Sequence, residues 1–306
     1  MESNSKLIGH DHIFNNLKEL YLNKKLPNII LLSGKKGIGK FLLASHCVNF
    51  MLSQDEIYKY DLKNFEINNQ NKSYILFKNN IHPNIFLMNK SNDKKFIEIL
   101  QIREMIKFQN NSSFNNKNKF IIIDSVNDLN INSTNSLLKS IEEPNNNLFF
   151  LLTKNSGYNI QNTLKSRCLE FKLYLTIKEV KLIVDNYFQE EIYDKISIDY
   201  INHYNSPSFL IELIHYFKGD EKNISTFLIE EFLLEIIKNR LYMSNDFIKE
   251  NLNIIIELFF YKNINNSKKI SYKIKEYFYQ KLTQIKKYNL DLETFFLEFE
   301  EKLLSE

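Results

Sequence analysis

The sequence NIILLSGKKGIGKF, from Asn28 to Phe41, joins a short apolar run to a glycine-containing turn and decides the fold class. An unbroken apolar run of this kind is typical of a strand buried on both faces of a parallel sheet. Similar runs occur at Phe120–Ile123 and Leu148–Leu152, and helical periodicity lies between them at Lys40–Leu52 and Thr134–Glu143. This alternation predicts an α/β domain with a parallel sheet, flanking helices and right-handed crossovers.

The second half of the chain has a different pattern. Beyond about residue 173 the segments show helical periodicity and contain almost no glycine or proline. Thr176 is a suitable N-cap for one helix, and Pro207 stands where the first turn of another helix tolerates proline. We therefore expect three domains: an α/β domain at 1–172, a small helical domain at 173–215 and an all-α domain at 216–306.

Charge and hydropathy exclude several classes of protein. The net charge is only +3 in 306 residues, and no strongly basic stripe marks a free-standing DNA-binding module. The apolar runs are far shorter than a membrane span, so we expect no membrane association and a cytoplasmic protein. Cys47 and Cys168 lack Cys or His partners at metal-binding spacing, which predicts neither a zinc site nor a disulfide framework.

Gly34, Gly39 and Lys40 have the spacing G-x-x-x-x-G-K between a predicted strand and a predicted helix, with Gly37 inside the loop. In a phosphate-binding loop, the glycines let backbone N–H groups face a phosphate, and the lysine reaches the terminal phosphates. The next residue normally supplies a hydroxyl oxygen to Mg²⁺, but here it is Phe41. The loop is therefore compatible with weak, vestigial nucleotide binding and equally with a tight strand-to-helix turn.

The second half of an ATPase site is also incomplete. A strand of such a site should end in Asp-Glu, where the aspartate supports the metal and the glutamate positions the attacking water. The run FIIID ends in Asp124, and Ser125 follows it. Because the chain lacks both the metal-binding hydroxyl and the water-positioning carboxylate, we expect no intrinsic ATP hydrolysis.

Two later motifs carry a family resemblance. The segments NSLLKSIEEP (Asn135–Pro144) and SRC (Ser166–Cys168) resemble the AAA+ core of clamp-loader subunits. Matching segments in the same order extend the resemblance over most of the first 215 residues. The two helical parts then correspond to the lid and collar domains of that family, although the tail has no motif of its own. Within the family the chain resembles the delta-prime type, whose phosphate loop is degenerate.

The resemblance implies a function and roles for particular residues. A delta-prime type subunit does not hydrolyse ATP, and its Arg167 would act as an arginine finger on the ATP of an adjacent gamma or tau subunit during clamp loading in DNA replication. Asn155 stands at the sensor position. The alternative is an autonomous AAA+ ATPase or an active gamma/tau-type subunit. That alternative requires Ser or Thr at position 41 and Glu at position 125.

The resemblance also implies partners within the DNA polymerase III holoenzyme. These are the gamma/tau and delta subunits, the sliding clamp and, through the assembled complex, primer-template DNA. Many delta-prime subunits carry a four-cysteine zinc module after the phosphate-loop helix, but only Cys47 lies near that place here. We therefore expect no zinc and no required cofactor, and the structure of the Ser53–Asn80 insertion stays open.

The helix that precedes Pro144 has two further expected features. Asn132 or Ser133 is available as its N-cap. Glu142 and Glu143 are neighbours in sequence at the other end and do not face each other, so they are interpreted as a helix end and not as a catalytic carboxylate pair.

Overall fold

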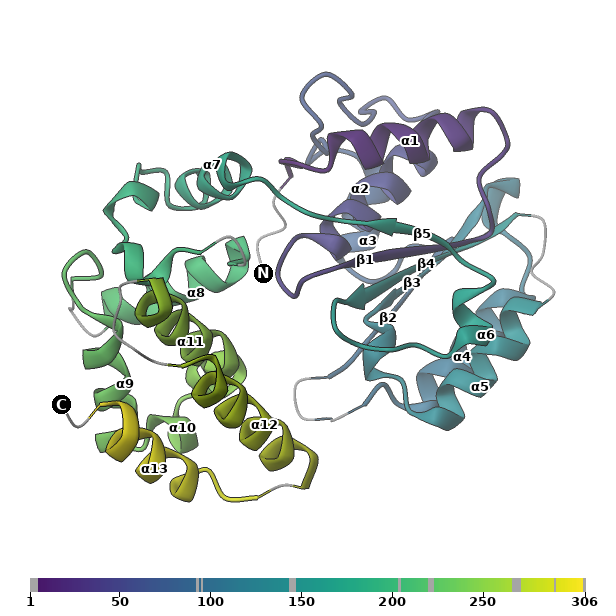
Figure 1. Ribbon diagram of the computed structural model, residues 1–306. Helices are drawn as coiled ribbons and strands as arrows, with labels where there is room; N and C mark the ends of the chain where they lie inside the picture. The colour runs from purple at the N-terminus through teal and green to yellow at the C-terminus, as the bar shows by residue number, and fades with distance from the viewer. Residues whose placement is uncertain are drawn as a thin grey trace. The chain divides into compact units, whose positions relative to one another are not determined.

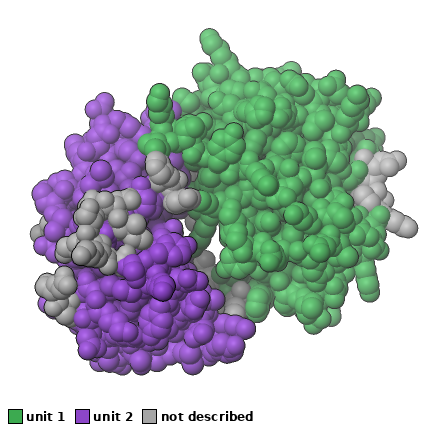
Figure 2. All heavy atoms as spheres, in the orientation of Figure 1, with its two compact units in different colours: residues 1–179 green, residues 180–306 purple. Residues whose placement is uncertain are grey.

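The computed structural model describes residues 5–91, 94, 96–142, 147–202, 205–219, 223–265, 271–288 and 290–304. The chain divides into two compact units, Met1–Glu179 and Val180–Glu306, which Figure 2 distinguishes by colour. The expected α/β domain lies within the first unit. The limits of the two expected helical domains, 173–215 and 216–306, stay predictions.

The first unit contains one five-stranded sheet in which every neighbouring pair of strands is parallel, in the order β2-β3-β4-β1-β5. Its strands are β1 (Ile29–Gly34), β2 (Ile85–Asn89), β3 (Lys119–Asp124), β4 (Leu148–Asn155) and β5 (Leu169–Lys172). Because all strands are parallel, their carboxyl ends meet at one edge of the sheet. The predicted α/β class is confirmed.

Helices cover both faces of this sheet (Figure 1). They are α1 (Asp11–Leu22), α2 (Lys40–Leu52), α3 (Lys72–Lys78), α4 (Ile99–Asn110), α5 (Ile131–Glu142) and α6 (Asn162–Lys165), and α7 (Ile177–Phe188) spans the division between the units. Short 3₁₀ segments lie at Phe114–Asn116 and Val126–Asp128. The layers are therefore helix, sheet and helix, as expected from buried parallel strands.

Alternate residues of β1 supply two separate hydrophobic cores. Ile30 and Leu32 belong to the cluster that includes residues of α1 and α2, whereas Ile29 and Leu31 belong to the cluster that includes residues of α4 and α5. Successive side chains of a strand point to opposite faces, so a strand buried on both faces must be apolar at every position. This requirement explains the unbroken apolar run of the sequence.

The N-cap of α5 differs from the prediction. The Oδ1 atom of Asn130 accepts a hydrogen bond from the backbone N–H of Ser133 at 2.9 Å, and this bond caps the helix. Naming Asn132 or Ser133 as the cap was therefore wrong, because the helix begins at Ile131, before either of them. Glu142 ends the helix as expected, while Glu143 and Pro144 lie outside the described residues.

The second unit is entirely helical where it is described. Besides most of α7 it contains α8 (Pro207–Gly219), α9 (Ile229–Lys238), α10 (Leu241–Ser244), α11 (Asp246–Asn265), α12 (Tyr272–Tyr288) and α13 (Glu293–Leu303), with 3₁₀ segments at Tyr193–Lys195 and Ile198–Tyr200. Helix α8 begins at Pro207, as predicted. Thr176 also caps α7 as predicted, since its Oγ1 accepts from the backbone N–H of Glu179.

A cation between two carboxylates connects distant parts of this unit. Nζ of Lys262 in α11 lies 2.7 Å from Oδ2 of Asp199 and 2.6 Å from Oε2 of Glu230 in α9. Burial acts to lower the pKa of Lys262, but these two bonds raise it above its ordinary value. The lysine therefore stays charged and ties the two helices to the segment around Asp199.

None of the described helices is both long and apolar enough to traverse a bilayer.

Candidate functional site

The glycines of the loop between β1 and α2 are required by its backbone geometry. The φ angle is +75° at Gly37 and +96° at Gly39, in the left-handed region that favours glycine. At Gly34 the constraint is close approach, because an added Cβ would lie 3.0 Å from the carbonyl oxygen of Leu173. These requirements hold with or without a phosphate, so the glycine spacing by itself does not distinguish a binding loop from a tight turn.

Lys40, the first residue of α2, donates all three of its ammonium hydrogens within the chain. Its Nζ lies 3.2 Å from the carbonyl oxygen of Gly34, 2.6 Å from that of Lys35 and 2.8 Å from Oδ1 of Asn155. An ammonium group has three N–H donors. Burial lowers the pKa of Lys40 to about 8, although the nearby Asp124 acts in the opposite direction. A phosphate at this loop would have to displace these acceptors.

A polar network joins the carboxyl ends of β3 and β4. Oγ1 of Thr153 donates to Oδ1 of Asp124 at 2.6 Å. Oγ of Ser125 donates to Oδ1 of Asn127 at 2.6 Å, and the same oxygen accepts from the backbone N–H of Asn155 at 2.9 Å. Sequence analysis missed Asn127, although a polar residue just after a strand-ending aspartate was a usable signal. Through Asn127 and Asn155 the Ser125 hydroxyl is connected to the ammonium group of Lys40.

Phe41 belongs to the hydrophobic core instead of the polar loop. Its half-buried side chain packs against the core cluster between α2 and the sheet, and its ring centroid lies 6.4 Å from that of Phe77 in α3. A benzyl side chain carries no oxygen, and Ser125 offers no carboxylate. The residues at these two positions therefore do not fit the Mg²⁺-ATP of a hydrolysing site.

His10, the residue before α1, contacts the loop between β1 and α2. Its Nε2–H donates to the carbonyl oxygen of Ile38 at 2.9 Å, so the imidazole is held against the loop. Burial lowers the pKa of His10, which keeps the ring neutral and leaves it one N–H to donate. The loop thus receives internal hydrogen bonds from both Lys40 and His10.

The structure brings most of the predicted site residues together. Gly34, Gly37, Gly39 and Lys40 meet Asp124 and Asn155 at the carboxyl edge of the sheet, where β1, β3 and β4 end. Arg167 is the exception. It precedes β5, whose first residue, Leu169, pairs with Ile30 near the amino end of β1.

The guanidinium of Arg167 has two partners in the described chain. Nη1 donates to the carbonyl oxygen of Thr163 in α6 at 2.8 Å, and Nη2 donates to Oε1 of Glu142 in α5 at 3.2 Å. The side chain of Arg167 remains 37% exposed, so the group is accessible from outside. Sequence analysis interpreted Glu142 only as a helix end. Its contact with Arg167 spans 25 positions and has no signal in the spacing.

The insertion at Ser53–Asn80 packs, through Tyr60 and other residues, into the hydrophobic core that also includes residues of α1 and α2. The Tyr60 side chain is 6% exposed, and its ring stacks on Phe14 with centroids 5.1 Å apart. A hydrogen bond of 2.8 Å joins its hydroxyl to Nδ1 of His46. Asn71, which is fully buried, caps α3 and also donates to the carbonyl oxygen of Tyr58 at 2.7 Å. Aromatic packing and amide hydrogen bonds therefore hold this segment.

The thiol nearest this insertion is a poor candidate for a metal ligand. Cys47 is 1% exposed in the apolar core, and burial raises its pKa. A cysteine binds a metal ion as the deprotonated thiolate, which a raised pKa disfavours. Within the described ranges no group of three His, Cys, Asp or Glu side chains could hold a metal ion. The expectation of a zinc-free protein stays a prediction.

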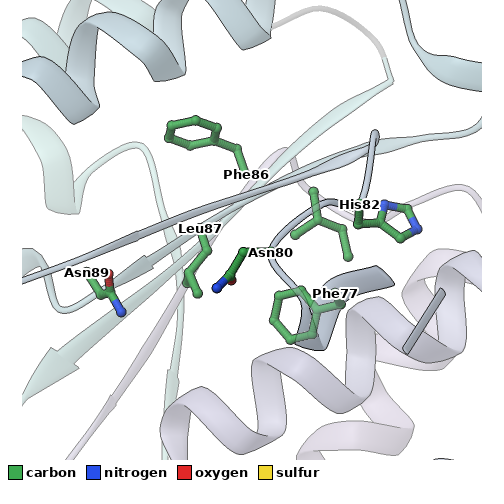
Figure 3. Close-up of a pocket in the computed structure, with 7 residues that line it drawn as sticks. Phe77, Asn80, His82, Phe86, Leu87 and Asn89 are labelled. Atoms are coloured by element: carbon green, nitrogen blue, oxygen red, sulfur yellow. The ribbon is translucent and has the colours of Figure 1, made fainter. Parts of the chain in front are cut away.

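A pocket of about 220 Å³ lies beside the edge strand β2 and does not involve the loop. Figure 3 shows Leu87 and Phe77 on one side of the strand and Phe86 on the other. His82 also lines this pocket, and its Nδ1 accepts a hydrogen bond from the backbone N–H of Asn84 at 3.1 Å. Burial lowers the pKa of His82 to about 4, and the nearby Lys117 adds to this effect while Glu56 opposes it.

His82 is expected to destabilise the folded chain as the pH falls. Between pH 6.5 and about pH 4 the unfolded imidazole binds a proton that the folded one does not, so stability is lost through this window. At pH 5 the loss should be on the order of 1–2 kcal/mol. Urea unfolding at pH 7 and pH 5 should show a smaller difference for His82→Gln than for the wild type. The exposed His12→Gln is the control, and an unchanged difference in His82→Gln would contradict the assignment.

Sequence comparison identifies the family. A family model described as "DNA polymerase III, delta subunit" matches residues 9–176, more than half of the chain. The chain is 33% identical over 168 residues to DNA polymerase III subunit delta' of Buchnera aphidicola subsp. Baizongia pistaciae, covering 53% of this chain and 48% of that one. It is 29% identical over 140 residues to subunit delta' of Pseudomonas aeruginosa, covering 46% and 41%. The match thus spans less than half the length of either relative.

Structural comparison supports the fold. A solved DNA polymerase III gamma subunit-related protein from Thermotoga maritima superposes with a TM-score of 0.50 at 13% identity, covering 92% of this chain and 96% of that one. At this identity the likeness concerns the fold alone, an α/β domain followed by helices. The chain belongs to the family described as DNA polymerase III, delta subunit, and it is of the clamp-loader delta-prime type.

Proposed function

We propose that this chain is a non-hydrolysing subunit of a DNA polymerase III clamp loader. It donates Arg167 to the ATP site of an adjacent subunit of the gamma or tau type while the sliding clamp is loaded. Its partners are the gamma/tau and delta subunits, with the clamp and primer-template DNA reached through the assembly. It works in the cytoplasm and needs no zinc or other cofactor of its own.

The observation that carries this proposal is the position of Arg167 relative to the chain's own loop. Leu169 pairs with Ile30, which is four positions before Gly34 at the end of β1. With a rise of about 3.3 Å per residue, the start of β5 lies about 13 Å along the sheet from the loop. Arg167 comes still earlier in the chain. A phosphate held at the chain's own loop would therefore lie away from this guanidinium, which supports an arginine finger supplied to another subunit.

The chemistry of the loop supports the non-hydrolysing half of the proposal. Phe41 packs in the core where a metal-binding hydroxyl would be needed, and Ser125 donates to Asn127 where a carboxylate would be needed. Lys40 is already hydrogen-bonded to three acceptors of this chain. The loop therefore serves as a structural connection between β1, β4 and α2.

The isolated chain is expected to show no ATP hydrolysis above the buffer rate. Added in increasing amounts to gamma/tau-type and delta subunits, it should raise their clamp- and DNA-stimulated hydrolysis until one copy is bound per assembly. Phosphate release measured during this titration tests both statements. Hydrolysis by the chain alone, in proportion to its concentration, would show that it is an ATPase in its own right.

A further inference from the structure

The ion pair between Arg167 and Glu142 links two elements that are separate in sequence. Arg167 follows α6, and Glu142 is the last residue of α5. The guanidinium donates to Glu142 with Nη2 and to the backbone carbonyl of Thr163 with Nη1. The two acceptors belong to different helices, α6 and α5, so together the two bonds fix both the position and the orientation of the planar group.

The location of Glu142 is unfavourable for the helix that carries it. The carboxyl end of a helix has a partial negative charge, so a carboxylate there is disfavoured unless a cation neutralises it. No other described cation forms an ion pair with Glu142. Helix stability therefore gives no reason for a glutamate here, whereas its contact with Arg167 does.

A guanidinium has five N–H donors in a rigid fork. Two of them are used by Glu142 and Thr163, and the side chain of Arg167 is 37% exposed. The remaining donors can therefore meet an external phosphate while the two internal bonds persist. An arginine held in this way does not have to lose its rotamer freedom when it contacts the phosphate.

We propose that Glu142 is a positioning residue that holds the Arg167 guanidinium in its working orientation before a neighbouring nucleotide arrives. This inference rests on the proposed function of Arg167. The ligand is the triphosphate of a nucleotide bound by an adjacent subunit. Glu142 does not touch that nucleotide, and it acts only through Arg167.

The test uses the complete assembly with ATP, clamp and primer-template DNA. Removing Glu142 leaves the guanidinium with only its bond to Thr163 and therefore more mobile. Glu142→Ala should lower kcat at the one ATP site that Arg167 reaches about three- to tenfold, the effect of having to immobilise one long side chain. KM should stay within about twofold, because a finger acts on the transition state. Glu142→Gln keeps an acceptor oxygen for Nη2 and should restore kcat to within about twofold of the wild type.

A double variant separates positioning from a general structural effect. In the Arg167→Ala background, Glu142→Ala should cause no further drop in kcat, because its effect passes through the arginine. Glu104→Ala is the matched control, since Glu104 is an exposed carboxylate on α4 outside the described ion pairs. Melting temperature and assembly by gel filtration should be the same for all variants.

The outcomes distinguish a failure of the positioning role from a failure of the proposed function of Arg167. If Arg167→Ala lowers kcat and Glu142→Ala does not, the positioning role is wrong and the finger stands. The positioning role is also wrong if Glu142→Gln lowers kcat as much as Glu142→Ala does. It is equally wrong if Glu142→Ala lowers kcat further in the Arg167→Ala background. If Arg167→Ala leaves kcat unchanged, the proposed function itself fails.

Discussion

Replacing Arg167 with alanine is expected to lower ATP hydrolysis about a thousandfold or more at the single ATP site that its guanidinium reaches in an assembled clamp loader. An arginine finger stabilises the negative charge that develops on the transferred phosphoryl group, and an alanine supplies nothing in its place. The ion pair with Glu142 is exposed, so its loss should change the unfolding free energy by less than about 1 kcal/mol. The defect should therefore appear in turnover and not in folding.

Single-turnover phosphate release from assemblies that contain the Arg167→Ala chain measures this effect. Lys165→Ala is a matched control, because Lys165 is an exposed cation at the end of α6, two residues before Arg167. Gel filtration should show that both variants assemble. Equal rates for the wild type and Arg167→Ala, with normal assembly, would remove the arginine from the mechanism.

Replacing Tyr60 with alanine is expected to lower the free energy of unfolding by about 3–5 kcal/mol. The Tyr60 ring packs against the rings of Phe14 and Phe50 and is 6% exposed. Its removal therefore leaves a cavity that the insertion cannot easily close. Tyr60→Phe loses only the hydrogen bond between the hydroxyl and His46, and it should lower the free energy of unfolding by about 1 kcal/mol.

Denaturant unfolding of the isolated chain measures these differences. Tyr58→Ala is the control, because the Tyr58 side chain is 44% exposed and should change stability by less than about 0.5 kcal/mol. Since the aromatic core holds the insertion, a metal chelator should leave the melting temperature of the wild type unchanged. A lower melting temperature with chelator, or full stability of Tyr60→Ala, would mean that something else holds this segment.

The sequence predicted the central strands but not the edge strands. β1, β3 and β4 are covered on both faces and both edges, so each contains an unbroken apolar run of at least four residues. β2 and β5 lie at the edges of the sheet, and most of their residues are half-buried or exposed. In β5, partial exposure admits Glu170, which interrupts the apolar signal. β2 was missed although Ile85–Met88 is an apolar run as long as Phe120–Ile123.

The sequence motif located the candidate loop residues, but it did not predict their hydrogen-bond partners. The spacing of Gly34, Gly39 and Lys40 follows from local backbone geometry, which a sequence motif records directly. The bond between Lys40 and Asn155 joins residues 115 positions apart. Such a contact depends on the order of the strands in the sheet, which brings β4 beside β1. The same applies to Arg167 and Glu142, and the insertion around Tyr60 carried no recognisable pattern.

One comparison tests the central claim most directly: the ATPase rate of the complete assembly with this chain as Lys40→Ala and with this chain as Arg167→Ala. If the chain lends a finger and does not hydrolyse ATP, Lys40→Ala should leave the rate within about twofold of the wild type, once its melting temperature shows that it is folded. Arg167→Ala should abolish the contribution of one ATP site. The reverse result, with turnover lost in Lys40→Ala and kept in Arg167→Ala, would show that the chain is an ATPase and contradict this account.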